Sequence, residues 1–303
     1  MAGLSGVLPI LPTIFDERGA IDEAGTRRVV DYIVAAGAKG VVFPGLASEY
    51  DTLSSDERLH MTARIGEWIG GRVPFVVGAS TPSTDDAVAF AAAGAQAGAA
   101  AAMILTPKPF ADDMRAMADF FRAAHEGSGI AIMLQNAPAP MGIGLPLEKV
   151  AELARAVDGI VYVKEEAPPS GQRITQLTEL AGGSLRAVFG GAGARYVIDE
   201  LVRGAEGTMP ACEITELHVT MLDKFHGGDE EGARDLFERT LPLLSMQAVF
   251  RWRLTKKVLQ QRGLIESDYV RAAGPALDRY DLQELDALLV RLSDLLPLDR
   301  VPA

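Results

Sequence analysis

A lysine at the end of a buried strand is the residue of this sequence best suited to covalent chemistry. The run 160–163 is β-branched and aromatic, and Lys164 follows it directly. Side-chain alternation along a strand places Tyr162 and Lys164 on the same face. An ammonium that faces an apolar interior loses hydration, which favours the neutral amine that attacks a ketone. The structural alternative is a lysine paired with Glu165 or Glu166.

A reactive amine at this position would form a Schiff base with a 2-oxo acid. The iminium withdraws electrons and acidifies the C3 hydrogens, so that either a substituent leaves the neighbouring carbon or the C3–C4 bond breaks. Glu166 returns to the inward face and would hold the proton of Lys164 or neutralise it. We expect neither a metal nor an organic cofactor, and the single cysteine, Cys212, and the four histidines lie in no metal-ligand spacing.

Short apolar runs alternate with helical patterns along most of the chain. We expect strands at 7–14, 40–44, 75–78, 102–106, 131–134, 160–164, 187–190 and 207–209. Amphipathic patterns predict helices at 22–36, 55–69, 84–97, 112–124, 147–156, 170–180 and 194–203. Continuous apolar strands that alternate with helices indicate a parallel sheet covered on both faces. This order predicts an α/β fold, a (β/α)8 TIM barrel, in residues 1–214, with the active site in that barrel.

From about residue 215 onward the strand signals stop. Helical patterns cover 216–224, 230–246, 249–262 and 281–295. We expect residues 215–303 to form a C-terminal helical extension that packs on the barrel without an independent core. Within it, Arg251-Trp252-Arg253 and Lys256-Lys257 form a basic stripe, for which a solvated face or a subunit contact is the expected role.

The charge balance restricts the class of partner. The chain has 41 acidic and 29 basic residues and a formal net charge of −12, which disfavours nucleic acid and anionic membrane surfaces. It does not disfavour a small anionic substrate, because a few local donors outweigh the global field. The single cysteine fits a reducing compartment, and the N-terminus lacks the basic region of a signal peptide. We therefore expect a cytoplasmic protein without a membrane segment.

The active sites of (β/α)8 barrels lie at the carboxyl ends of the strands, so the polar residues there are the candidates. Ser48, in the turn after the second strand, would bind a carboxylate or the leaving hydroxyl group, and it is the second catalytic candidate beside Lys164. Its alternative role is turn formation and helix capping. Glu49 is expected to accept hydrogen bonds from backbone N–H groups. The candidate substrate contacts are Gly45, Ala47, Ser48, Asn136, Gly190 and Thr208.

Several segments occur together in an order that resembles a known family. They are Pro12-Thr13-Ile14-Phe15, a Gly-x-x-x-Glu turn at 45–49, Leu53-Ser54-Ser55-Asp56-Glu57-Arg58, Thr106-Pro107, Val163-Lys164-Glu165, Gly190 and Gly204-Ala205-Glu206-Gly207. Over nearly the whole chain this set resembles the dihydrodipicolinate synthase / N-acetylneuraminate lyase family of class I aldolases. The resemblance implies a barrel with C-terminal helices, often a tetramer, and Lys164 as the Schiff-base residue.

The sequence departs from that family in three segments, one of which has Lys108-Pro109 in place of the aromatic pair after Thr106-Pro107. Leu46 and Ala47 replace the hydroxyl residues that bind the pyruvoyl carboxylate and join a proton relay, so only backbone N–H groups and Ser48 remain for that carboxylate. Gln135 replaces the usual tyrosine after the fifth strand and cannot act as a general acid or base. The pattern is more similar to the 2-keto-3-deoxy sugar acid dehydratases, particularly those that act on a keto-deoxy pentonate.

These observations leave three hypotheses open. The first is a Schiff-base lyase that dehydrates a 2-keto-3-deoxy sugar acid. The second is an aldolase that cleaves such an acid to pyruvate or condenses pyruvate with an aldehyde. The third is a barrel without catalytic activity that binds or senses a 2-oxo acid. In each case the expected partner is a small 2-oxo acid, and the expected assembly is a homo-oligomer, either a dimer or a tetramer.

Overall fold

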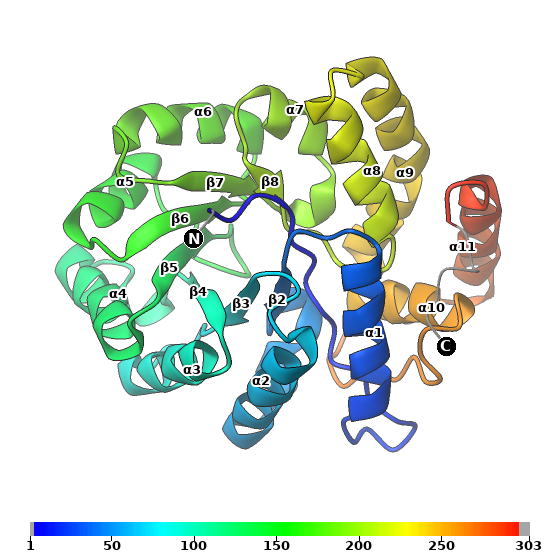
Figure 1. Ribbon diagram of the computed structural model, residues 1–303, viewed down its shortest axis with the longest axis horizontal. Helices are drawn as coiled ribbons and strands as arrows, with labels where there is room; N and C mark the ends of the chain where they lie inside the picture. Colours follow the sequence, from blue (N-terminus) through cyan, green and yellow to red (C-terminus); the bar gives the residue numbers. More distant parts are fainter. Residues whose placement is uncertain (1–2, 297–303) are drawn as a thin grey trace.

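Eight parallel strands form the centre of the molecule in the computed structural model, which describes residues 3–296 (Figure 1). Each strand pairs with its sequence neighbour, β1 pairs with β8, and a bridge between Ile10 and Val42 joins the first and second strand segments. The sheet therefore closes, and the predicted barrel is confirmed. The strands are β1 Gly6–Val7, β2 Val41–Phe43, β3 Phe75–Gly78, β4 Ala99–Leu105, β5 Ala131–Asn136, β6 Ile160–Glu165, β7 Ala187–Gly190 and β8 Gly207–Thr208.

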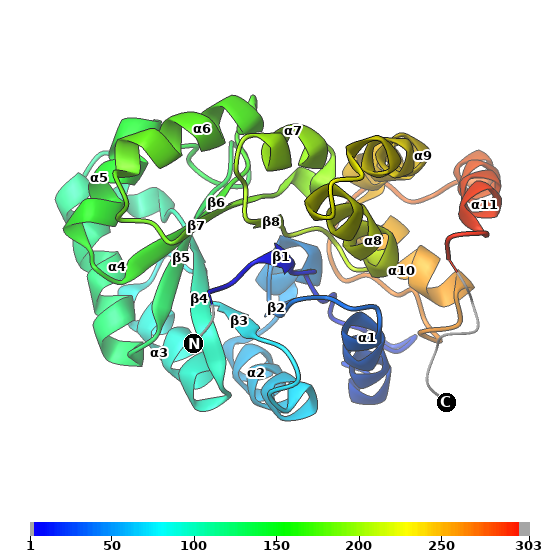
Figure 2. The same cartoon turned by 45° about the horizontal axis from the view of Figure 1, so that its top comes forward.

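A helix follows each strand and covers the outside of the barrel (Figure 2). Several start at the short polar side chains that cap helices: Asp22 accepts from Gly25 N–H, Ser83 accepts from Asp86 N–H, and Ser54 forms a capping box with Glu57. The helices are α1 Glu23–Ala35, α2 Ser55–Ile69, α3 Thr84–Gln96, α4 Met114–Ser128, α5 Leu147–Ala156, α6 Ser170–Ala181, α7 Val197–Val202 and α8 Thr215–His226.

The first strand is shorter than predicted. Regular pairing ends at Val7, whereas the sequence pattern predicted a strand through residue 14. Pro9 and Pro12 have no N–H to donate, so the ladder cannot continue without interruption. Isolated backbone hydrogen bonds still join this segment to both of its neighbours: Ile10 N–H donates to Pro210 O, and Leu11 N–H donates to Val42 O. This irregular segment still closes the barrel.

Two apolar layers hold the barrel together. The outer layer packs the helices against the outward-facing strand residues, such as Leu134, Val163 and Val188. The inner layer fills the barrel with residues that alternate with these, including Met133, Tyr162 and Phe189. Successive residues of a strand belong to different layers, so every second side chain faces the barrel interior.

The C-terminal extension consists of α9 Glu230–Phe250, α10 Trp252–Gln261 and α11 Arg279–Leu292. A third apolar cluster joins α7 and α8 to these three helices. Helices α9 and α10 are separated by one residue, Arg251, whose φ of 51° ends the helical path. The division of the chain into residues 1–214 and 215–303 stays a prediction.

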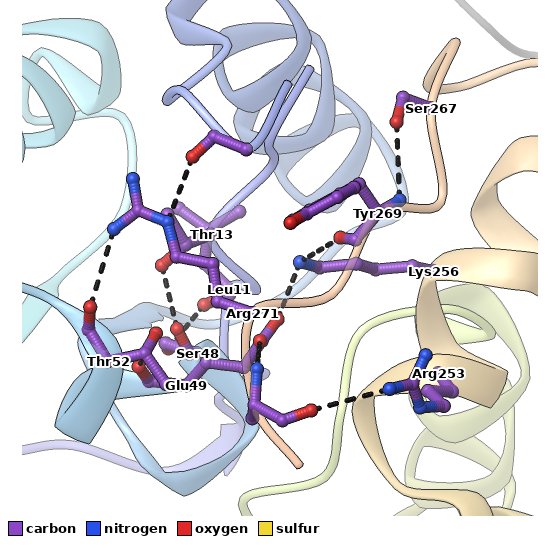
Figure 3. A network of polar contacts seen from close by, with 12 residues as sticks. Leu11, Thr13, Ser48, Glu49, Thr52, Arg253, Lys256, Ser267, Tyr269 and Arg271 are labelled. Atoms are coloured by element: carbon purple, nitrogen blue, oxygen red, sulfur yellow. Dashed lines mark hydrogen bonds and ion pairs between the residues drawn. The ribbon is translucent and has the colours of Figure 1, made fainter. Parts of the chain in front are cut away.

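A buried ion pair connects α10 to the turn that follows β2 (Figure 3). Lys256 Nζ lies 2.5 Å from Glu49 Oε1, both side chains are fully buried, and Nζ also donates to Tyr269 O at 2.8 Å. The other Glu49 oxygen accepts from Ala272 N–H at 2.8 Å, as expected of a carboxylate that binds backbone N–H groups. Burial lowers the pKa of Lys256 to about 8, and the attraction of Glu49 opposes this shift. The pair thus fastens the extension to a loop at the carboxyl end of the barrel.

No helix in residues 3–296 is long and apolar enough to cross a membrane.

We predict that Gly78→Ala disrupts the carboxyl end of the barrel. A Cβ at Gly78 would lie 1.6 Å from the carbonyl oxygen of Pro44, a backbone atom that cannot turn aside. The substitution should lower the free energy of unfolding by about 3 kcal/mol, measured by urea denaturation. Gly274→Ala is the matched control, since nothing lies within 4 Å of its Cβ position. Equal stability of the two variants would contradict the close approach of β3 to Pro44.

We also predict that Lys256→Met lowers the free energy of unfolding by about 3–5 kcal/mol, because it leaves the carboxylate of Glu49 buried without its cation. The double variant Lys256→Met/Glu49→Gln should lose less than the sum of the two single changes. Lys224→Met, which removes one partner of an exposed pair with Asp229, should cost less than about 1 kcal/mol. Additive effects in the double variant would show that the two side chains do not interact.

Candidate active site

A cavity of about 300 Å³ lies at the carboxyl end of the barrel. Its floor contains Lys164 and Glu166 from the end of β6. Its walls come from the turn after β2, the loops after β5 and β7, and the junction of α9 and α10. The residues around it are Ile10, Leu46, Ala47, Pro140, Met141, Lys164, Glu166, Ala192, Gly193, Arg195, Met209, Ala211, Gln247, Ala248, Arg251 and Trp252.

Lys164 reaches this cavity from inside the barrel. It follows Tyr162 of the inner layer, so the alternation read from the sequence gives its actual direction. Its residue is 4% exposed, and Nζ lies 3.2 Å from Glu166 Oε1. In register, Lys164 is flanked by Gln135 of β5 and Phe189 of β7. The amine therefore has one carboxylate partner and open space beside it.

Glu166 is held by three groups. Gln135 Nε2 donates to one carboxylate oxygen at 2.6 Å, and Ala192 N–H donates to the other at 3.1 Å, next to Lys164 Nζ. Burial by itself raises the pKa of this carboxyl group, but the ammonium of Lys164 and these hydrogen bonds outweigh it, so that the pKa lies below its usual value. Gly191 leaves room for this arrangement, since a Cβ there would lie 2.5 Å from Glu166. An ionised carboxylate thus lies beside the amine.

The turn after β2 contains a short 3₁₀ helix, η1 Leu46–Ser48. The first N–H groups of a helical turn have no partner inside it. Within the described part of the chain, Leu46 N–H and Ala47 N–H donate to no other group, and both residues line the cavity. Adjacent N–H groups of this kind can bind a carboxylate although neither side chain is polar.

Ser48 does not lie on the cavity wall. Its hydroxyl donates to Leu11 O and accepts from Gly45 N–H, while Thr13 Oγ1 donates to its carbonyl oxygen (Figure 3). The side chain is fully buried and turned back toward the first strand segment. The structure therefore gives Ser48 the alternative role considered above, that of forming the turn, and the catalytic role expected for Ser48 is not supported. Gly45, expected as a substrate contact, donates its N–H to Ser48 instead.

Three further candidate contacts face away from the cavity. Asn136 Nδ2 donates to Leu145 O at 3.1 Å and to Glu165 at 2.8 Å, and its Oδ1 accepts from Leu145 N–H. Gly190 and Thr208, like Asn136, occupy the strand positions that alternate with the inner layer. These residues therefore do not contact the space beside Lys164. Of the candidates named from the sequence, the structure brings Ala47, Lys164 and Glu166 to the cavity.

The α9–α10 junction contributes side chains to the cavity, although the sequence predicted a solvated face or a subunit contact for them. Arg251 and Trp252 line the cavity, and Lys256 is fully buried. The expectation of a solvated face is therefore wrong for Lys256, and the alternative of a subunit contact stays a prediction. A helical pattern shows one apolar face but does not show that the helix ends on top of a barrel. The stop at Arg251 turns its side chain into the site.

In the described range, 3–296, no group of three or more His, Cys, Asp or Glu side chains is arranged to hold a metal ion.

Comparisons with known proteins agree with this geometry. The model of the dihydrodipicolinate synthetase family matches residues 3–291. The L-2-keto-3-deoxyarabonate dehydratase of Azospirillum brasilense is 30% identical over 96% of this chain and 95% of its own length. The 4-hydroxy-tetrahydrodipicolinate synthase of Hyphomonas neptunium is 31% identical over 78% of this chain and 81% of its own.

A solved structure shows the same architecture. The dihydrodipicolinate synthase of Rhodopseudomonas palustris superimposes with a TM-score of 0.87 at 27% identity, over 95% of this chain and 98% of that one. The fold, the lyase class and the family inferred from the sequence are confirmed. The chain belongs to the dihydrodipicolinate synthetase family.

Proposed function

We propose that this protein dehydrates a 2-keto-3-deoxy sugar acid through a Schiff base on Lys164. The observation that carries the proposal is the pair of Lys164 and Glu166, 3.2 Å apart at the floor of a cavity, with Gln135 bonded to Glu166. An amine for condensation and an ionised carboxylate for proton transfer are adjacent. The identity of one relative as a keto-deoxy acid dehydratase supports the same reading.

Substrate binding starts at the turn after β2. The C1 carboxylate accepts hydrogen bonds from Leu46 N–H and Ala47 N–H, which brings the C2 ketone to Lys164. The amine adds to C2, water leaves, and an iminium forms. Because the iminium keeps the positive charge of the lysine, the attraction that holds Glu166 in its ionised form persists.

Proton transfer then depends on Glu166. Its carboxylate removes a proton from C3, and the electrons of the C3–H bond move toward the iminium to form an enamine. The enamine returns its electrons and expels the C4 hydroxyl group, which takes the proton from Glu166 and leaves as water. Hydrolysis of the unsaturated iminium restores the amine and releases a 2-oxo-3-enoic acid. For a substrate with a C5 hydroxyl group, this acid tautomerises to the 2,5-dioxo acid without gain or loss of atoms. One carboxyl group therefore serves as base and then as acid.

The departure at Gln135 favours dehydration over aldol chemistry. Cleavage of the C3–C4 bond requires a group that removes the proton of the C4 hydroxyl, and the family tyrosine that would do so is absent. The amide of Gln135 instead donates to Glu166 and orients it. Dehydration requires no such relay, since the same hydroxyl group leaves with the proton that Glu166 took from C3.

A second buried carboxyl group, Glu200 of α7, lies behind the site. Ser170 Oγ donates to it at 2.7 Å, and its other oxygen lies where a Cβ of residue 190 would come within 1.8 Å, which explains Gly190. Burial raises the pKa of Glu200 to about 7, and repulsion from Glu166 acts in the same direction. The two carboxyl groups therefore differ in protonation, and the one beside Lys164 is ionised.

The central test combines trapping and product analysis. Reduction with borohydride in the presence of a keto-deoxy acid or pyruvate should attach the substrate to Lys164, which mass spectrometry detects. Turnover of a keto-deoxy pentonate should yield a dioxo acid without pyruvate. Formation of pyruvate and an aldehyde would favour the aldolase instead, and the absence of an adduct with every 2-oxo acid would favour a barrel that only binds.

We predict that Lys164→Arg loses turnover by at least about three orders of magnitude and forms no adduct. Glu166→Gln should still be trapped by borohydride, but with kcat lower by about 10²–10⁴-fold, because condensation remains and proton transfer is lost. Lys224→Ala, which removes an exposed charge of α8 outside the cavity, is the control and should change kcat less than about threefold. Activity within a few-fold of wild type in the Lys164 variant would exclude the mechanism.

We also predict a pH-dependent stability difference between the wild type and Glu200→Gln. The folded state keeps the proton of Glu200 up to about pH 7, whereas the unfolded chain releases it above about 4.5. Its contribution is therefore complete below pH 4.5 and is lost as the pH rises through 7, a change of about 3 kcal/mol. Urea unfolding at pH 5 and pH 8 should show this fall in the wild type relative to the variant. A constant difference across that range would contradict the raised pKa.

A further inference from the structure

The cavity holds more positive charge than a substrate with one carboxylate neutralises. Lys164, Arg195 and Arg251 line it together with a single carboxylate, Glu166, which leaves a formal excess of two positive charges. The whole chain carries −12, so this excess is local. A substrate that brings one negative charge would leave one guanidinium without a counter-charge in a partly enclosed space.

Arg251 lies in the cavity without an anionic partner. Within residues 3–296 it forms no ion pair; its polar contact is Met141 Sδ at 3.6 Å, and its guanidinium stacks on the Trp252 ring at 4.4 Å. Its backbone has φ 51° and ψ −123°, a conformation that is strained for a residue with a side chain. The side chain is half-buried, and within the described residues its guanidinium donates to Met141 Sδ and to no oxygen. A strained backbone and guanidinium donors without an anionic partner at the cavity wall indicate a binding role.

Arg195 and Gln247 approach the same point from two elements. A Cβ on Gly193 would lie 3.2 Å from both Arg195 Nη1 and Gln247 Oε1. Arg195 follows β7, and Gln247 lies on α9 one turn before Arg251. Arg195 forms no ion pair in the described part of the chain. The barrel and the extension therefore each contribute a guanidinium to one side of the cavity.

We propose that Arg251 and Arg195 bind a second anionic group at the far end of the substrate, which makes the preferred substrate a 2-keto-3-deoxy sugar acid with a charged terminus. This inference rests on the proposed function, in which the C1 carboxylate occupies the turn after β2. A guanidinium presents paired N–H donors that match a carboxylate or a phosphate, and both termini share this chemistry. Two negative charges on the substrate balance the excess of two on the protein.

The binding test uses 2-oxo acids matched in length, which can condense with Lys164 but lack the C4 hydroxyl group and so cannot be dehydrated. Calorimetry should compare 2-oxoglutarate with 2-oxopentanoate and 2-oxoadipate with 2-oxohexanoate, since each pair differs at the terminal group alone. In the wild type, the charged member of at least one pair should bind about 10–100-fold more tightly. Arg251→Gln and Arg195→Gln should each reduce that preference to less than about threefold. Equal binding within both pairs in the wild type would overturn the inference.

Two further variants separate recognition from folding. Arg251→Gly removes the guanidinium and relieves the positive φ, so it should be at least as stable as the wild type while losing the preference. Lys257→Gln, which removes a positive charge from α10 outside the cavity, should retain it. A preference that survives in Arg251→Gly, or that disappears equally in Lys257→Gln, would mean that Arg251 does not bind the terminus.

Kinetic measurements distinguish a terminal carboxylate from a terminal phosphate. They also separate this inference from the proposed dehydration. Dehydration of a six-carbon keto-deoxy dicarboxylate, a keto-deoxy 6-phosphate and the corresponding acid with a terminal hydroxyl should show kcat/KM at least about tenfold higher for one charged substrate. A higher value for the uncharged acid would overturn this inference and leave the proposed dehydration intact. If no acid is dehydrated, the proposed function fails, and the calorimetric comparison still decides whether a charged terminus is recognised.

Discussion

The site depends on keeping an ammonium and a carboxylate together inside a barrel. Lys164 and Glu166 are both nearly inaccessible, and each would be costly to bury alone. The attraction between them and the hydrogen bonds from Gln135 and Ala192 keep Glu166 ionised in spite of its burial. Most of the surrounding architecture serves this pair, from the glycine at 191 to the register that places β5 next to β6.

The same chain contains a second buried lysine and carboxylate, Lys256 and Glu49, which can be compared with the pair that is proposed to react. Lys256 donates to Glu49 and to Tyr269 and does not line the cavity that contains Lys164. Lys164 has one partner and space for a ketone. The structural pair supports the reactive one, since Glu49 ends the turn whose N–H groups face the cavity. Burial alone therefore does not make a lysine a nucleophile; an unfilled volume beside its amine does.

In the proposed mechanism, the replacement of the family tyrosine by Gln135 leaves proton transfer to Glu166. A phenol can give up a proton, but an amide can only hold its neighbour in place, and here that neighbour is Glu166. Glu200, with a pKa near 7, stays largely protonated in acid and does not compete with Glu166 for the ammonium. The loop after β7 and the extension each add one guanidinium group to the cavity wall, Arg195 and Arg251. The floor of the cavity is thus suited to the chemistry common to 2-oxo acids, and its outer wall to the choice among them.

The sequence by itself determined the barrel, the helical extension, the family and the inward direction of Lys164, because strand alternation and local residue patterns are short-range properties. Asn136 and Thr208 occupy strand positions that face the helices. Applied to β5 and β8, the same alternation would have selected the neighbouring residues Gln135 and Met209 instead. Ser48 could not be placed from the sequence, since its bond to Leu11 depends on the contact between the first two strand segments. Nor could Arg251 and Lys256, which belong to a distant helix. Only tertiary packing decides where the junction of α9 and α10 crosses the barrel. That crossing places Arg251 at the cavity and Lys256 in the core.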